Sequence, residues 1–172
     1  MCNNLLHIAY WPSRPITRFL LNRMLTDNVR GLNNSCGQLR SQWLDQKVKI
    51  LKEHNSPALR SVLKSSFDPN IKWVLPEGDV PYTKNDAPAG TEHTTLATES
   101  RQLWHFIKGG DGQTPQWKKE QMFVQLLEGL HESEAELLVN VKDKKVHQVY
   151  KGLSTNVVCE AFNWNDNFML MS

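Results

Sequence analysis

"FIKGGDGQTPQWKKEQMFVQLLEGLHESEAELL", from Phe106 to Leu138, decides how this chain is interpreted, because it resembles a phosphate loop beside a metal site. A phosphate loop follows a strand and has the pattern GxxxxGK[ST], so that a lysine after the glycines reaches the phosphates. Here Lys108 precedes the glycines, and a helical pattern precedes Lys108. The apolar residues after Pro115 recur at helical spacing. We therefore interpret the stretch as helices separated by turns.

The segment HESEAE, which begins at His131, contains only part of the zinc motif HExxH. The second histidine is missing, because position 135 is Ala. Acidic residues in a first helical turn complement the helix dipole, and Ser133 with Glu136 matches a capping box. We predict the start of a helix here. We expect no metal and no cofactor.

The same patterns predict a mainly α fold: an irregular bundle of five to six short helices. The predicted helices are 41–54 with Ser41 as N-cap, 55–67 with Ser56 and Pro57 at its start, 91–110 ending at Gly109, 114–131 with Thr114 and Pro115 at its start, 133–144, and 153–164 capped by Ser154.

A long connection over residues 71–90 interrupts the helical patterns. It contains three prolines and two glycines, but it is too apolar for a disordered loop. We predict an extended, Pro-rich strap that lies across the helices. Long ordered connections are often functional. The candidate partner-binding residues in it are the aromatic and acidic side chains Trp73, Glu77, Asp79, Tyr82 and Asp86.

A second hypothesis rests on lysines near the start of the helix predicted over 114–131 and at and after the end of the helix predicted over 133–144. Lysines give sequence-independent affinity for phosphates, so they are candidate nucleic-acid contacts. They are Lys118, Lys119, Lys142, Lys144, Lys145 and Lys151. The same composition is typical of an exposed turn between helices, and the net charge of +2 is too small to favour either interpretation.

The sequence contains no pattern that indicates an enzyme. Cys2, Cys36 and Cys159 are scattered, which fits a reducing compartment. Cys159 lies in an apolar stretch, where a buried and unreactive thiol is the usual case. No apolar run approaches the roughly 18 residues of a membrane span. We expect a non-enzymatic protein with no membrane segment.

The composition changes near residue 45. Residues 1–45 contain arginines but no lysine or glutamate, whereas most acids and all lysines follow. We predict an atypical Arg-rich extension over residues 1–41 and a single helical domain over residues 42–172. Three interpretations of the extension remain open: a transit segment, a disordered arm, or non-native sequence translated from an early start.

Residues from about Val48 to Phe168 resemble a family of small proteins of unknown function from T-even-like tailed phages, including cyanophages. The resembling stretches are SPALRSVLKSSFDPNIKWVLPEGDVPYTKNDAPAGTEH, FIKGGDG, FVQLLEGLHESEAELL, VKDKK, YKGLS and VVCEAFNWNDNF. The resemblance implies a phage protein in the host cytoplasm, which argues against a transit segment. It implies no catalytic residues. We expect an accessory protein that binds a host or phage protein in replication, transcription or assembly; the alternative is sequence-nonspecific nucleic-acid binding.

Overall fold

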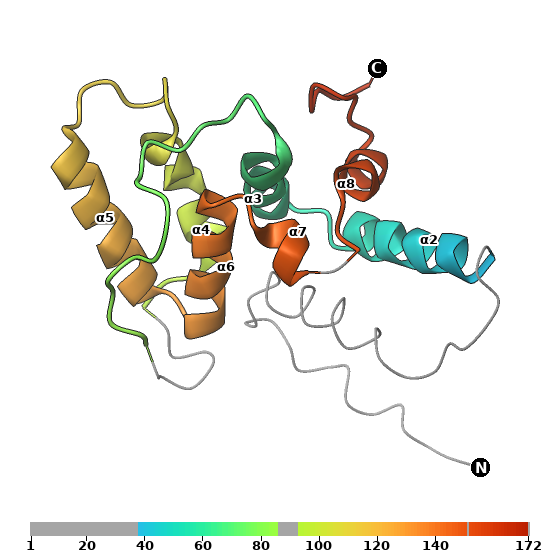
Figure 1. The fold of residues 1–172 in the computed structure, drawn as a ribbon, viewed down its shortest axis with the longest axis horizontal. Coiled ribbons are helices and arrows are strands. Elements are labelled where there is room, and N and C mark those ends of the chain that lie inside the picture. Colours follow the sequence, from blue (N-terminus) through green and yellow to red (C-terminus); the bar gives the residue numbers. More distant parts are fainter. Residues whose placement is uncertain (1–37, 86–92, 151, 172) are drawn as a thin grey trace, which may run out of the picture.

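A computed structural model describes residues 38–85, 93–150 and 152–171. Its helices, in chain order, are α2 (Gln38–Glu53), α3 (Pro57–Phe67), α4 (Leu96–Glu99), the 3₁₀ helix η1 (Ser100–Phe106), α5 (Gln116–Gly129), α6 (Glu132–Lys142), α7 (Val146–Val149) and α8 (Thr155–Phe162) (Figure 1). No strand occurs in these ranges, where the only β features are two isolated bridges. The mainly α prediction is confirmed. Most of the predicted Arg-rich extension lies outside the described residues.

Helix α3 lies at the centre of the helical arrangement. It packs against α6 and also contacts α4, η1 and α8. Helix α2 packs against α8, and α5 packs against α6 and η1. In Figure 1, α5 lies at one end of the molecule and α2 at the other. The fully buried side chains that form the core include Leu59, Leu96, Phe106, Phe123, Leu127, Leu130, Leu138 and Phe168.

Two of the predicted helix starts are confirmed by their hydrogen bonds. The Ser56 hydroxyl accepts from the backbone N–H of Leu59, and Pro57 occupies the first position of α3. The Ser154 hydroxyl accepts from the N–H of Val157 at the start of α8. A side-chain oxygen at this position satisfies an N–H that has no partner within the helix.

Three other predicted starts are wrong. Ser41 lies inside α2, which begins at Gln38. Pro115 is the N-cap of α5, because the Thr114 hydroxyl donates instead to the Asp111 carboxylate. His131 is the N-cap of α6, since its Nδ1 accepts from the N–H of Ser133. The caps of α5 and α6 lie one and two residues from the predicted ones.

The predicted helix over residues 91–110 is wrong in type and in its end. A single turn of α-helix, α4, passes directly into η1, which ends at Phe106. The backbone then becomes extended and forms an antiparallel bridge between Ile107 and Trp73. Because Phe106 and Lys108 use their backbone groups for this pairing, the helix cannot continue to Gly109.

Candidate functional site

Residues 71–85 connect α3 to the region before α4 without regular secondary structure, and their backbone is attached at three places. The first attachment is to the end of η1. The N–H of Val74 donates to Phe106 O at 2.8 Å, and the N–H of Lys108 donates to Lys72 O at 2.8 Å. These two bonds flank the Trp73–Ile107 bridge and hold the beginning of the segment in an extended conformation.

The second attachment is to the end of α6. Lys142 Nζ donates to Pro76 O at 2.8 Å and to Gly78 O at 3.1 Å, and it also pairs with the Asp143 carboxylate. The N–H of Gly78 donates to Asp143 Oδ2 at 3.3 Å. The side chain of Lys142 is only 1% exposed, so it is buried beneath the segment. Burial alone would raise the pKa of Asp143, but hydrogen bonds from Lys142 and Lys145 outweigh it and lower the pKa.

The third attachment joins the segment to α5 and α6. The N–H of Thr83 donates to Glu128 Oε1 at 3.1 Å. Lys84 Nζ lies 2.7 Å from Glu132 and 3.3 Å from Glu136. The hydrogen bond to Glu132 is the main reason that the pKa of Lys84 is raised and the pKa of Glu132 is lowered. The segment therefore runs from η1 past both ends of α6, as its course beside α5 and α6 shows in Figure 1.

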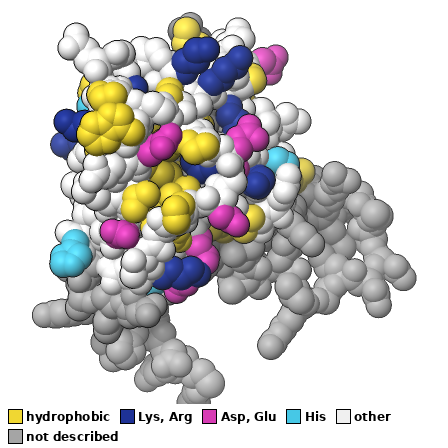
Figure 2. All heavy atoms as spheres, turned by 60° about the vertical axis from the view of Figure 1, so that its left-hand side comes forward, with side chains coloured by type: hydrophobic (Ala, Val, Ile, Leu, Met, Phe, Trp, Pro, Cys, Tyr) yellow, Lys and Arg dark blue, Asp and Glu magenta, His cyan; other side chains and the backbone are white. Residues whose placement is uncertain are grey.

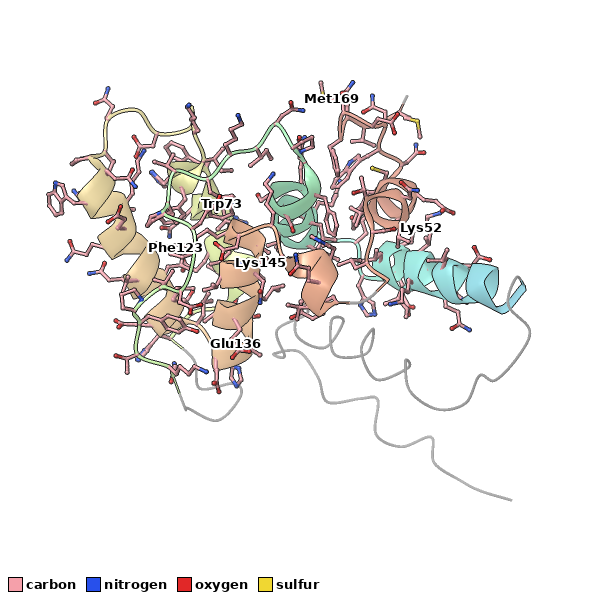
Figure 3. All side chains as sticks on the ribbon, in the orientation of Figure 1. Lys52, Trp73, Phe123, Glu136, Lys145 and Met169 are labelled. Atoms are coloured by element: carbon pink, nitrogen blue, oxygen red, sulfur yellow. The ribbon has the colours of Figure 1, made fainter. Side chains whose placement is uncertain are left out.

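Some of the predicted partner-binding residues are exposed, and others are partly buried against the helices. Glu77 and Asp79 are exposed. Trp73 is half-buried, and its Nε1 donates to Ser65 O at 3.4 Å. Its ring lies edge-on to the ring of Phe123 with 6.3 Å between the ring centroids; both residues are labelled in Figure 3. Tyr82 is also half-buried, and burial raises its pKa. Asp86 and the rest of the predicted strap, residues 86–90, lie outside the described residues.

A hollow of about 250 Å³ lies between this segment and α5. Apolar groups form most of it, and the only charged residues that line it are Asp79 and Glu120. We call it the α5 hollow; its lining residues are Leu75, Pro76, Asp79, Val80, Pro81, Glu120, Gln121, Phe123 and Val124. Figure 2, which brings α5 forward, shows hydrophobic side chains grouped in the middle of this face with both acidic and basic side chains around them.

A second hollow, of about 520 Å³, lies on the other side of the segment. It is lined by residues of both charges, namely Lys72, Glu77, Lys142, Asp143 and Lys144, together with Pro69, Ile71, Trp73 and Leu75. Because its cations and acids are interleaved, it favours neither an anionic nor a cationic ligand.

The predicted nucleic-acid contacts do not form one exposed basic surface. Lys119 is buried and donates to Asp111 O, and Lys142 is buried under residues 76–78. Lys144 donates to Asp68 O, and burial lowers its pKa. Lys145 is half-exposed and bound to Asp143, whose hydrogen bond raises the pKa of Lys145.

Of the two remaining candidates, Lys118 is exposed, and Lys151 lies outside the described residues. The amino groups of Lys119, Lys142 and Lys144 all donate to backbone carbonyl groups of the chain, and phosphate binding by the six lysines stays a prediction.

The glycine-rich turn after Lys108 has a structural explanation, although it is not the expected helix end. Gly109 has a φ of +89°, which favours glycine. A Cβ on Gly110 would lie 2.1 Å from Trp104 O, so no larger residue fits there. Within the described ranges, no group of three or more His, Cys, Asp or Glu side chains is placed to hold a metal ion.

Sequence reasoning missed a polar cluster around Asp111. Its carboxylate accepts from the N–H groups of Gln113 and Thr114 and from the Thr114 hydroxyl, and it lies 2.9 Å from His105 Nδ1. The Thr114 hydroxyl is the main cause that holds the pKa of Asp111 well below its usual range. The sequence DGQT, an aspartate followed by turn residues, was the signal available for this arrangement.

Cys159 is partly buried, and its thiol contacts Asn165 O at 3.7 Å. Burial raises the pKa of this thiol, which keeps it protonated at neutral pH.

The described helices include none with both the length and the apolar character that a membrane span requires.

The fold and the site define an α-helical protein with an irregular surface segment attached across α5 and α6. Residues 39–148 match the model of a family of unknown function, DUF6433, and the chain belongs to this family. No curated protein and no solved structure matches the chain.

Proposed function

We propose that the chain is a phage accessory protein that acts in the host cytoplasm by binding another protein, without catalysing a reaction. The binding surface is the 71–85 face, by which we mean the exposed side of residues 71–85 and the adjoining parts of α5 and α6. The resemblance to proteins of T-even-like tailed phages supports the phage origin. The partner we propose is a host or phage component of replication, transcription or assembly.

The observation that carries this proposal is the way in which the segment is attached. A buried ion pair, Lys142 with Asp143, is used to hold the backbone of residues 76–78. Burying charged groups costs free energy that is recovered only when they are well paired, so such pairs are weak devices for stability alone. Holding a loop in one conformation lowers the entropic cost of binding a partner. The carboxylates of Glu77 and Asp79 remain exposed on this ordered backbone.

The proposal is tested by affinity purification of the tagged chain from infected host cells after nuclease treatment. The test variant is Glu77→Lys with Asp79→Lys. The matched control is Asp45→Lys with Glu160→Lys, which makes the same charge change at exposed positions on α2 and α8. We expect the test variant to lose a stoichiometric protein partner that the wild type and the control retain. Equal recovery by all three proteins would contradict the proposal.

Nucleic-acid binding is the alternative outcome of this experiment. In a parallel purification without nuclease, recovery of nucleic acid alone, falling steeply with salt, would support it, because contacts to phosphates release counterions. Four of the predicted lysines already donate to groups within the chain, which places this alternative second.

A further inference from the structure

The α5 hollow has the chemistry of a site for one kind of protein segment. Six of its lining residues are apolar, namely Leu75, Pro76, Val80, Pro81, Phe123 and Val124. A concave surface of this kind can bind an apolar side chain, because water is then released from the hollow and from the side chain.

Its charged groups carry one sign only. Asp79 is exposed at one side, on residues 71–85, and Glu120 lies on α5. No Lys, Arg or His lines the α5 hollow. The Glu120 carboxylate accepts a hydrogen bond from Gln116 Nε2 at 2.9 Å, and this donor is neutral. The same amide donates to Val74 O at 2.9 Å, so Gln116 also connects α5 to the segment.

The walls of the hollow are held in place before any partner binds. On one side, Lys142 holds the carbonyl groups of Pro76 and Gly78. On the other side, Phe123 is buried and packs edge-on against Phe106 at 5.2 Å. The site is thus preorganised, which lowers the free-energy cost of occupying it.

We infer that the α5 hollow receives a short segment of the partner protein in which an apolar side chain is flanked by Lys or Arg. This inference rests on the proposed function and names the chemistry of the partner. The apolar side chain enters between Val80 and Val124, and its basic neighbours lie against Asp79 and Glu120. Opposite charges at the rim favour this segment over acidic ones and speed its encounter with the site.

The test is a selection from a randomised library of displayed heptapeptides on the immobilised full-length chain. We expect enrichment of peptides in which Leu, Ile, Phe, Met or Trp stands beside Lys or Arg. A synthetic peptide from this set should bind about tenfold or more weakly to Val124→Arg, which fills the hollow with a repelling cation. Asp79→Asn should weaken binding about two- to fivefold, an effect that added salt diminishes.

Two further variants separate loss of the site from loss of the fold. Gln121→Arg places the cation at an exposed lining position and should also weaken binding. Gln125→Arg is the matched control, because Gln125 is exposed on the same helix and does not line the hollow. It should bind like the wild type.

Several results would overturn the inference. They are the enrichment of acidic or uncharged peptides, no enrichment at all, or equal binding by Val124→Arg and Gln125→Arg. A concentration-dependent doubling of molecular mass that Val124→Arg abolishes would instead make a second copy of this chain the occupant. If the partner from infected cells is lost from the Glu77→Lys, Asp79→Lys variant but retained by Val124→Arg and Gln121→Arg, this inference fails and the proposed function stands. If no protein partner is recovered at all, the proposed function itself fails.

Discussion

Lys142 is the single residue on which the position of residues 76–78 depends most directly. Its amino group donates to two backbone carbonyls and pairs with Asp143, and its side chain is almost completely buried. Removing one partner of a buried, hydrogen-bonded charge leaves the others desolvated and unpaired.

We expect Lys142→Met to lower the free energy of unfolding by about 3 kcal/mol, because it leaves the carboxylate of Asp143 without this cation. Lys145→Met is the control, since the Lys145 side chain is 51% exposed and its pair with the same carboxylate should contribute far less. Urea unfolding followed by circular dichroism measures both. Similar losses for the two variants would show that Lys142 does not hold the segment.

Asp111 leads to a prediction about pH. Its pKa is lowered in the folded protein, mainly by the Thr114 hydroxyl and then by His105. A carboxyl group whose pKa is depressed by folding stabilises the protein above its unfolded pKa, about 3.9, and this contribution is lost as the pH falls toward the folded value.

We therefore expect Asp111→Asn to be less stable than the wild type at pH 7 and to lose less of its stability between pH 4 and lower values, measured by urea unfolding at each pH. Asp45→Asn, at an exposed position on α2, should follow the wild-type profile. An unchanged acid profile for Asp111→Asn would refute the role of this carboxylate.

The residue contacts that were predictable from the sequence are local. Ser56 and Ser154 cap helices through bonds to residues three positions away, so a short pattern identifies them. The burial of Lys142 was not predictable, because the carbonyl groups that accept from it lie 66 and 64 residues away in the chain. No short pattern reports such a contact, and a buried lysine has the same letter as an exposed one.

At the scale of elements, the turn at Gly78 determines the course of the segment. Gly78 has a φ of +102°, and a Cβ there would meet no atom within 4 Å. The expected cost of Gly78→Ala is therefore backbone strain alone, about 1–2 kcal/mol. Gly112 also has open space but no such φ, so Gly112→Ala should change stability by less than about 0.5 kcal/mol. Thermal unfolding of the two variants makes the comparison, and an equal effect would argue against the turn.

Glu134 joins α6 to α4. Its carboxylate is buried and accepts from the N–H of Leu96 at 2.9 Å, at the first residue of α4. We expect Glu134→Ala to cost about 2–3 kcal/mol, because a buried N–H loses its acceptor. Glu136→Ala, two residues later, removes an exposed pair with Lys84 and should cost far less. Chemical denaturation distinguishes the two, and equal costs would contradict the role of Glu134.

The elements were predictable where an apolar stripe runs along one face, as in α3, α5 and α8. The region that became α4 and η1 also has such a stripe, with Leu96, Leu103 and Phe106 buried. Its 3₁₀ geometry and early end depend on pairing with Trp73 from a distant segment, which tertiary contacts alone decide. The apolar content of residues 71–90 predicts an ordered strap, but the ion pair that attaches residues 76–78 could not be foreseen.

At the scale of the whole molecule, the helices support the irregular segment of residues 71–85. α3 and α6 form the centre, and α6 carries residues that hold the segment at both of its ends: Glu132 and Glu136 at its start and Lys142 at its finish. We therefore propose that the partner binds on the side of α5 and α6, away from α2 and α8.

The proposed position of the binding surface can be tested by hydrogen–deuterium exchange of the full chain, alone and with its purified partner. We expect the partner to slow exchange in residues 71–85 and in the Glu120–Val124 part of α5, with α2 and α8 unchanged. Slower exchange in α2 or α8, with no change in residues 71–85, would contradict it.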